Sequence, residues 1–255
     1  MDNNTLDFNF WPSFSDLMLT LVLILVIVVF AVIAAFSVGT EEPTPPEPDP
    51  PEGEVIPPEV QQKQMDMIHA IAAAYGVLSK EVETNTFEIK RRTGVNRYTT
   101  ITIKNEPTLQ RFSFSDRILF EPDKYNLSIS GKETMQKVGD QIKEKLDNIT
   151  EIQIQGHADP DKPTFEPSNL HLAAKRAITV FQFLQEKIDI DPAKHLMSAT
   201  SFGEYKPVQR KNGDKTYTLE KLKEHNLTKE LKDNNRRIDI LLFYRNEKTD
   251  EQKDE

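Results

Sequence analysis

The sequence predicts a single N-terminal transmembrane helix followed by an α+β two-layer sandwich. Three observations carry this prediction. An uncharged apolar run of 22 residues extends from Leu17 to Val38, a segment rich in proline and glutamate follows it, and strand-type and helix-type hydrophobic patterns alternate from about Arg111 onward. Such an apolar run has no place in a simple soluble enzyme, so we set that class aside.

The net charge of −9 is concentrated at the N-terminal end. No Lys or Arg precedes Lys63, whereas ten acidic residues do, so residues 1–62 carry −10 and the remainder carries +1. A nearly neutral C-terminal part without a basic stripe lacks the electrostatic footprint of a nucleic-acid-binding protein. The absence of cysteine also excludes disulfides, thiolate zinc sites and thiol nucleophiles.

We divide the chain into six segments. They are a short cytoplasmic N-terminus (1–15), a transmembrane helix (16–38), a linker rich in Pro and Glu (39–60), an amphipathic helix with a β-hairpin (61–110), the sandwich domain (111–245) and a charged tail (246–255). As a helix the apolar run spans roughly 33 Å, enough to cross a bilayer once. A cleaved signal peptide is the alternative, but its apolar core is shorter and follows a basic start.

The linker and the segment after it connect the membrane helix to the sandwich. At about 3.1 Å per residue, some 20 proline-rich residues reach roughly 60 Å. An apolar stripe then indicates a helix that packs on the following domain, with a dimer contact or a channel-plugging helix as alternatives. The stripe consists of Met65, Ile68, Ala72, Tyr75 and Val82. Phe87 to Arg92 and Arg97 to Ile103 predict a hairpin that adds strands to the sheet.

The sandwich domain is predicted from an alternation of strand and helix signals. In chain order these are a short apolar run at Ile118 to Phe120, a helix from Ser130 to Leu146, a strand from Glu151 to Gln155, a helix from Asn169 to Lys187 and a closing strand from Arg237 to Tyr244. This βαβαβ order with a final strand predicts two layers.

The residues before the apolar run resemble the N-terminus of MotB-type subunits, the B components of ion-driven bacterial motors. Those subunits carry an aromatic residue, a short polar stretch and then Asp-Leu/Met-Met-Thr; Phe10 to Thr20 here reads FWPSFSDLMLT. The resemblance implies that Asp16 is the ion-carrying carboxylate, with Thr20 one turn further along the same face. The alternative is a carboxylate that only complements the helix dipole among lipid headgroups.

Later motifs resemble the OmpA-like peptidoglycan-binding domain, as found in OmpA and MotB. They are IQIQGHAD at 152–159, NLHLAAKRA at 169–177, FGE at 202–204 with Pro207, and NRRIDI at 235–240. The likeness covers about residues 111–244 and implies the OmpA/MotB C-terminal type of sandwich. Ala158 and Ala173 depart from the usual Thr and Ser, and residues 208–235 hold a Lys-rich insertion that reshapes one edge of the expected groove.

The peptide stems of peptidoglycan contain an amino acid with both an ammonium and a carboxylate, so a receptor needs a carboxylate and a guanidinium. By resemblance these are Asp159 and Arg176, and the supporting contacts are Asn169, Arg236 and Arg237. The alternative is a salt bridge between Asp159 and Arg176 that merely ties strand to helix. His157, Asp159 and His171 are too few for a metal site, and no catalytic set is present, so we expect neither metal nor enzymatic activity.

Together the resemblances imply a subunit of a proton- or sodium-driven motor in the bacterial inner membrane, without a cofactor. We expect its N-terminus in the cytoplasm and its C-terminal domain in the periplasm, the usual outcome for an anchor this close to the start of the chain. The implied partners are a second copy of the chain, a ring of MotA/ZorA-like polytopic subunits, expected to be a pentamer, and peptidoglycan. The short N-terminus without bases favours the B subunit of Zorya anti-phage systems, ZorB; the alternatives are a flagellar stator subunit and an OmpA-like tether without ion conduction.

Overall fold

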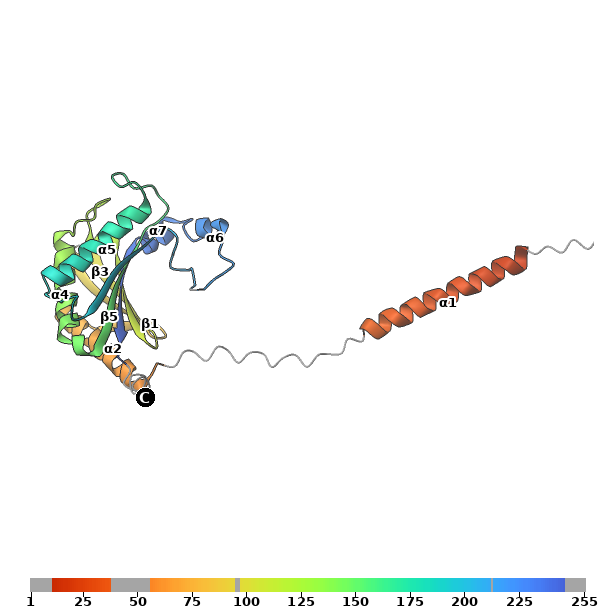
Figure 1. Ribbon diagram of the computed structural model, residues 1–255, viewed down its shortest axis with the longest axis horizontal. Helices are drawn as coiled ribbons and strands as arrows, with labels where there is room; N and C mark the ends of the chain where they lie inside the picture. The colour runs from red at the N-terminus through yellow and green to blue at the C-terminus, as the bar shows by residue number, and fades with distance from the viewer. Residues whose placement is uncertain (1–10, 38–55, 95–96, 212, 246–255) are drawn as a thin grey trace, which may run out of the picture. The chain divides into compact units, whose positions relative to one another are not determined.

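The computed structural model of the chain describes residues 11–37, 56–94, 97–211 and 213–245 (Figure 1). They belong to two compact units, Met1–Gly53 and Glu54–Glu255. The predicted N-terminus up to residue 10, most of the predicted linker and the tail 246–255 lie outside the described residues.

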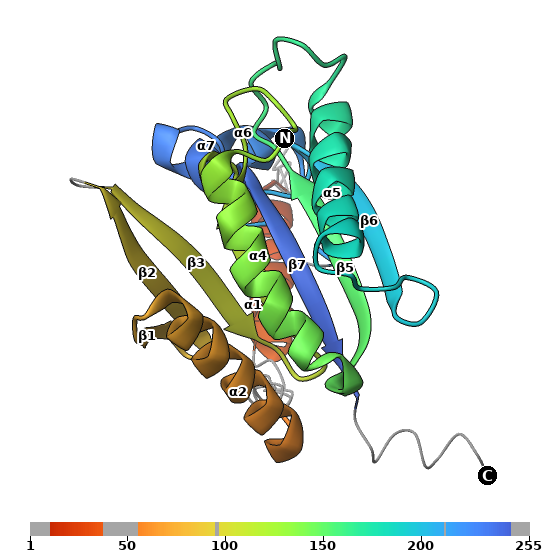
Figure 2. The same cartoon turned by 90° about the vertical axis from the view of Figure 1, so that its left-hand side faces the viewer.

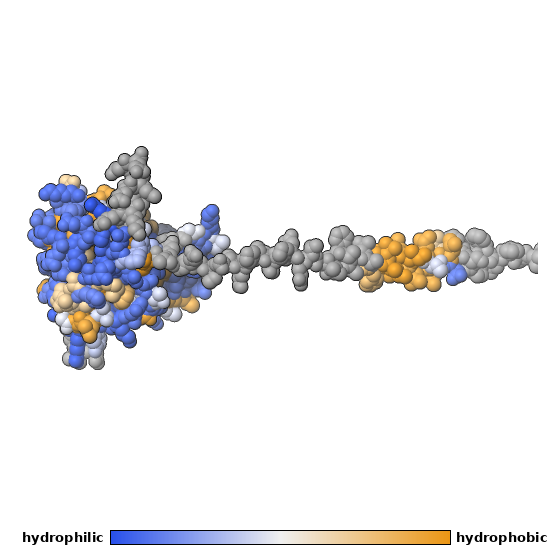
Figure 3. All heavy atoms as spheres, turned by 90° about the horizontal axis from the view of Figure 1, so that it is seen from below, coloured by the Kyte–Doolittle hydropathy of each residue, from blue (hydrophilic) through white to orange (hydrophobic). Residues whose placement is uncertain are grey.

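The first unit is built on one helix, α1 (Trp11–Ser37), of 27 residues. Its described side chains from residue 16 to residue 30 are exposed, and most are apolar (Figure 3). The Thr20 hydroxyl donates to the backbone carbonyls of Asp16 and Leu17, both at 2.9 Å, so Thr20 lies one turn from Asp16 as expected. Within the described part of the chain, no helix is long and apolar enough to span a membrane. The transmembrane segment 16–38 therefore stays a prediction.

The second unit contains a seven-stranded mixed sheet in the order β1-β2-β3-β4-β7-β5-β6. The strands are β1 (Ser79–Glu83), β2 (Thr86–Gly94), β3 (Arg97–Asn105), β4 (Leu109–Ser115), β5 (Ile149–His157), β6 (Leu196–Gly203) and β7 (Arg237–Tyr244). All neighbours are antiparallel except β5 and β6, which are parallel. The final strand thus lies in the middle of the sheet, between β4 and β5.

Helices cover one face of this sheet. They are α2 (Pro58–Tyr75), α4 (Ile129–Glu144) and α5 (Asn169–Glu186), which lie side by side in front of the strands in Figure 2. Shorter helical turns are α3 (Asp116–Leu119), η1 (Leu146–Asn148), α6 (Leu219–Glu224) and α7 (Lys229–Asn235). The two-layer α+β architecture predicted from the sequence is therefore confirmed.

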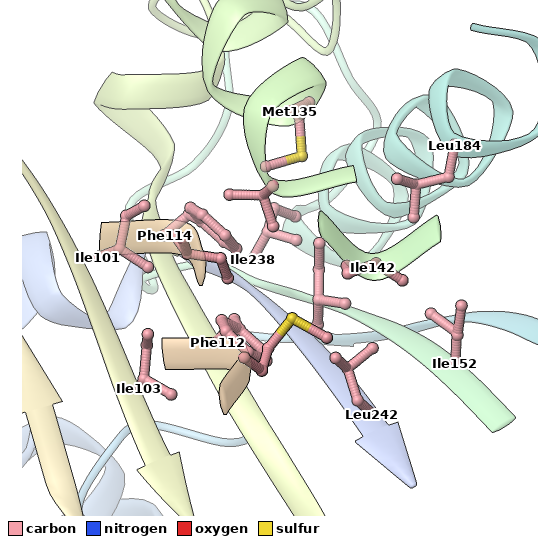
Figure 4. Close-up of a cluster of buried hydrophobic side chains, with 14 of the residues drawn as sticks. Ile101, Ile103, Phe112, Phe114, Met135, Ile142, Ile152, Leu184, Ile238 and Leu242 are labelled. Carbon is pink, nitrogen blue, oxygen red and sulfur yellow. The ribbon is translucent and has the colours of Figure 1, made fainter. Parts of the chain in front are cut away.

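The core lies between the helix layer and the sheet (Figure 4). Because side chains alternate across a strand, every second residue of a central strand faces the helices. In β7 these are Ile238, Ile240 and Leu242, and they are buried. From the helices, Met135 and Leu184 fill the space above them.

The predicted hairpin is confirmed. Strands β2 and β3 pair antiparallel, with Phe87 opposite Ile103 and Arg92 opposite Tyr98, while residues 95 and 96 lie outside the described residues. Strand β3 continues the sheet by pairing with β4, which crosses the expected segment boundary at 110/111. The hairpin and the sandwich therefore share one sheet.

Two expected features are wrong in detail. Ile118 to Phe120 is not the opening strand: Asp116–Leu119 forms the turn α3, and the strand is β4, whose LQRFSFS sequence alternates in burial. Val82 does not extend the helical stripe, because α2 begins at Pro58 and ends at Tyr75. Gly76 terminates it in a left-handed conformation, with φ of 66°, and Val82 then lies exposed on β1.

Candidate functional site

Four charged side chains from separate parts of the chain meet near the end of β5. Asp116 begins α3 and Asp159 follows β5. Arg176 lies about two turns into α5, and Arg236 directly precedes β7. We refer to these four residues as the charge quartet. Their charges cancel, since two carboxylates face two guanidinium groups.

The quartet is linked by ion pairs in the order Arg176, Asp116, Arg236, Asp159. Arg176 Nη1 donates to Asp116 Oδ2 at 3.2 Å, and Arg236 Nε lies 3.8 Å from the same oxygen. Arg236 Nη1 donates to Asp159 Oδ2, and Asp159 Oδ1 accepts the backbone N–H of Asp161 at 3.0 Å. Asp116 is therefore shared between the two arginines.

Most of the quartet is withdrawn from solvent. The side chains of Arg176, Asp159 and Asp116 are 4%, 5% and 12% exposed, whereas the Arg236 side chain is 23% exposed. Burial raises the pKa of both Asp116 and Asp159, and the neighbouring arginines oppose that rise. Arg236 is thus the member that an approaching molecule meets first.

The loop between α3 and α4 contacts Arg176, and the loop after β5 is tied to it. Its Nε donates to the Lys124 carbonyl at 3.0 Å, and its guanidinium lies 5.1 Å from the centre of the Phe120 ring. The loop after β5 is tied to the Lys124 loop by Thr164 Oγ1, which donates to Asp123 Oδ2 at 2.6 Å. Arg176 is therefore fixed by packing and by its Nε and Nη1 atoms.

The position of α5 depends on a close approach to β5. A Cβ atom at Gly156 would lie 2.1 Å from the Ala173 carbonyl oxygen, a distance that backbone atoms cannot accommodate. The helix starts at Asn169 after Ser168, whose hydroxyl caps it by accepting the His171 N–H at 3.4 Å. These two features set where Arg176 stands relative to the strand.

The insertion at 208–235 borders the quartet. Asp233 of α7 accepts hydrogen bonds from Arg236 and from Arg117, the latter at 2.7 Å. Lys232 pairs with Asp161 at 2.5 Å, and Asn235 accepts the Val208 N–H at 2.9 Å. The insertion therefore reaches the charge quartet through α7. The sequence predicts it at one edge of the binding groove.

The structure brings most, but not all, of the predicted wall-binding residues together. Asp159, Arg176 and Arg236 lie in the charge quartet. Asn169 is buried at the first position of α5, the helix that also carries Arg176. Within the described residues no ion pair joins Asp159 to Arg176, so the simple strand-to-helix salt bridge is not formed. Asp116 was not predicted. The sequence signal for it is an acidic residue that directly follows the alternating strand 109–115 and stands two positions before the apolar pair 118–119.

Arg237 does not join the others. Neighbouring residues of a strand point to opposite faces, so Arg237 faces away from the helix layer while Arg236 does not. Arg237 Nε donates to Asp239 Oδ1 and Oδ2 at 3.2 and 3.1 Å. The proposed supporting contact at Arg237 thus lies in a different cluster.

That second cluster surrounds the fully buried Asp239. Ser113 Oγ donates to its carboxylate at 2.8 Å, Arg111 lies at 3.4 Å and His157 Nε2 at 3.3 Å. Burial alone raises the pKa of Asp239, but Arg237, His157 and Arg111 outweigh it and hold the pKa well below its usual range. Burial lowers the pKa of His157, which stacks on Phe202 with ring centres 5.3 Å apart. The cluster holds the centre of the sheet together.

The residues considered for a metal site are separated. His157 points to Asp239, and His171 Nδ1 lies 2.8 Å from the Ser168 hydroxyl at the helix start. No group of three or more His, Cys, Asp or Glu with the spacing of a metal site occurs in the described part of the chain.

Comparisons with known proteins agree with this architecture. The sequence model of the OmpA family matches residues 119–217, and no curated protein sequence matches the chain. A putative MotB-like protein from Desulfovibrio vulgaris is 18% identical with a TM-score of 0.52, over 74% of this chain and 95% of that one. This likeness shows a shared fold.

Two further solved structures are similar at TM-scores below 0.5. The periplasmic domain of Helicobacter pylori MotB is 18% identical, with a TM-score of 0.47 over 66% of this chain and 94% of that one. The cell wall anchor of the T6SS from Pseudomonas aeruginosa is 17% identical, with a TM-score of 0.44 over 57% and 88%. The chain thus carries an OmpA-like domain, which is a structural anchor and not an enzyme, in a fold shared with a MotB-like protein.

Proposed function

We propose that the chain anchors a bacterial inner-membrane complex to peptidoglycan through the charge quartet. The observation that carries the proposal is the meeting of two carboxylates and two guanidinium groups at the end of β5 in an OmpA-like domain. The wall's peptide stems offer an ammonium and a carboxylate on one amino acid. A neutral quartet can exchange internal partners for these two groups without leaving a net buried charge, which limits the cost of binding.

Binding to purified peptidoglycan sacculi tests this proposal. We expect the full chain in detergent to co-sediment with sacculi, and Arg176→Gln to weaken binding by about tenfold or more, because a charge-assisted hydrogen bond to the ligand carboxylate is lost. Lys187→Gln is the matched control: it also removes a cation, but from the exposed residue that directly follows α5. Equal loss in both variants, or none in either, would contradict the proposal; circular dichroism checks that both fold.

We further propose that the segment 16–38 crosses the inner membrane once and that Asp16 carries a proton or a sodium ion. The support is the uncharged 22-residue run in the sequence, the helical conformation from Trp11 to Ser37 and the placement of Thr20 one turn after Asp16. One elementary charge moved through 100 mV releases about 2.3 kcal/mol, a sufficient energy source for a motor. In this proposal two copies of the chain stand inside a ring of MotA/ZorA-like polytopic subunits, a pentamer in the related motors, and the wall-bound domains in the periplasm keep them from rotating.

The variant Asp16→Asn tests ion transport, because it keeps the side chain's shape and removes its titratable group. We expect the variant to be expressed, to reach the membrane and to bind the wall, and to lose the activity of the complex in cells. Full activity at normal expression would contradict the ion-carrying role. A tether without ion conduction is the second candidate, favoured if the purified chain forms an isolated homodimer with no polytopic partner.

Among ion-driven systems we propose anti-phage defence of the Zorya type over a flagellar stator. The supporting observation is the string Ser-Phe-Ser-Asp-Leu-Met at 13–18, which resembles the corresponding segment of the Zorya B subunit. Deleting the gene in its own host is the direct test: reduced protection against phage with unchanged swimming supports defence, and lost swimming with unchanged phage resistance contradicts it.

A further inference from the structure

An open groove lies on the helix layer, beside the first half of α4. Its volume is about 610 Å³, a size typical of ligand-binding pockets. In Figure 2, α4 lies between α2 and the hairpin on one side and α5 on the other. We call this hollow the basic groove. Its lining residues are Arg91 of β2, Lys132, Glu133, Gln136 and Lys137 of α4, Phe183 of α5 and Lys187, which directly follows α5.

The basic groove carries an excess of positive charge. Four of its lining residues are cationic and only Glu133 is acidic, whereas the charge quartet is neutral. Within the described part of the chain, no ion pair neutralises Arg91, Lys132 or Lys187. Like charges gathered in one hollow repel one another, and an anion bound among them relieves that repulsion. The groove therefore favours an anionic ligand.

Two of the four cations are held in place by Tyr75. The Arg91 guanidinium lies 5.9 Å and the Lys137 ammonium 4.9 Å from the centre of the Tyr75 ring. Lys137 Nζ also donates to the Ala74 carbonyl at 2.8 Å, and Tyr75 itself is buried at the end of α2. Because these two cations are already positioned, less side-chain entropy is lost when an anion binds between them.

The basic groove also offers apolar surface. Phe183 packs against the hydrophobic core from its partly buried position and lines the groove with one aromatic ring. The lysine side chains add their methylene stems, which cover apolar surface while the ammonium groups reach water. Apolar surface beneath a basic rim suits an amphiphile with an anionic head. A hydrated polyanion, in contrast, uses the rim alone.

We propose that the basic groove binds an anionic phospholipid, with the lipid phosphate among the cations and the apolar part of the lipid against Phe183. Basic pockets next to a bilayer commonly take anionic headgroups, and each Lys or Arg adds to the attraction. The inference rests on the proposed membrane anchor for its supply of lipid, because an anchored chain meets lipid at high local concentration. It uses no residue of the charge quartet.

Mixed micelles test lipid binding with the full chain. The chain has no cysteine, so Gln136→Cys places a single environment-sensitive fluorophore in the basic groove. We expect phosphatidylglycerol in a nonionic detergent to shift the emission saturably, and phosphatidylcholine with the same acyl chains to bind at least about tenfold more weakly, because its headgroup is neutral overall. Thr200→Cys, exposed on β6 and outside the groove, is the labelling control and should not respond. Equal binding of the two lipids would overturn the inference.

Two matched pairs of substitutions test the cations. Lys132→Gln combined with Lys187→Gln should weaken phosphatidylglycerol binding about 25-fold, at about fivefold for each lysine near an anionic lipid. Lys104→Gln combined with Lys194→Gln removes the same charge from exposed positions outside the basic groove, and should change binding by less than about twofold. Circular dichroism checks that both variants fold. Equal weakening in the two variants would show a response to net charge alone and overturn the groove as the site.

Two further probes distinguish the sources of negative charge. Inorganic phosphate and polyglutamate, each at the same concentration of charge, should bind more weakly than phosphatidylglycerol. Equal or tighter binding of phosphate would assign the groove to a free anion, and equal or tighter binding of polyglutamate would assign it to an acidic protein segment; either result overturns the lipid.

Binding to sacculi separates this inference from the proposed function. The variant with Lys132→Gln and Lys187→Gln should bind sacculi as wild type does, and a loss of that binding would assign the basic groove to the wall and overturn the inference. Wild type that binds no sacculi, or that fails to span a bilayer, contradicts the proposed function alone, because micelles supply the lipid without wall or bilayer.

Discussion

The close approach of the β5 backbone to the α5 backbone gives a quantitative prediction. A Cβ atom at Gly156 would lie 2.1 Å from the Ala173 carbonyl oxygen, which is 1.3 Å inside the 3.4 Å limit of ordinary contact. Both groups belong to backbone, one in β5 and one in α5, so neither can move alone. Gly156→Ala must push α5 away from the sheet, and overpacking of this kind costs about 1–3 kcal/mol of the free energy of unfolding.

In a unit of about 200 residues that cost lowers the melting temperature by about 2–12 °C. Calorimetry of the full chain in detergent measures it, and binding to sacculi should fall in the same variant because Arg176 moves with α5. Gly139→Ala is the comparison: its added Cβ would meet side-chain atoms, Ile188 Cγ1 at 2.6 Å and Cδ1 at 2.9 Å, which can shift without moving a strand or a helix, and alanine favours the helix. A Gly156→Ala protein as stable as wild type would refute the close approach of β5 and α5.

Three other predictions concern charges around the sheet. Asp239→Asn should lower the free energy of unfolding by about 3–5 kcal/mol, measured by urea titration, because Arg237 then loses its buried counter-charge. Burial lowers the pKa of His157 in the folded protein, so near and below the ordinary pKa of histidine the unfolded chain binds more protons than the folded one. The free energy of unfolding should therefore fall as the pH is lowered from 7.5 to 5.5, and His157→Gln should flatten that slope. Lys232→Ala should change the free energy of unfolding by less than about 1 kcal/mol, since its partner Asp161 is largely exposed; a larger loss would mean that α7 depends on this pair.

Local sequence patterns predicted most of the fold. The hairpin from Phe87 to Ile103 and the closing strand from Arg237 to Tyr244 carry β-branched and aromatic residues in alternation, and both strands form as expected. The error at Ile118 arose because a short apolar run fits a strand and a buried turn equally well. The alternation of residues in β4 is what distinguishes the strand from the turn, since residues 110, 112 and 114 are buried.

The site was predicted less completely than the fold. Sequence motifs placed Asp159, Arg176 and Arg236 at one end of the domain, but they could not assign partners, which depend on contacts between distant segments. Arg236 and Arg237 are adjacent in sequence but belong to different clusters, because Arg236 follows α7 and pairs with Asp159 and Asp116, while Arg237 begins β7 and pairs with Asp239. Asp116 escaped notice because its role follows from the two arginines that converge on it.

The most direct test of wall recognition by the quartet is nuclear magnetic resonance of the full chain in detergent, labelled with 15N at arginine. Titration with a muropeptide whose stem amino acid has a free amine beside its carboxylate should shift the Nε signals of Arg176 and Arg236, which flank Asp116. The signals of Arg111 and Arg237, which lie with Asp239 on the other face of the sheet, should stay in place. Shifts confined to Arg111 and Arg237 would place the ligand on that other face and contradict recognition by the quartet.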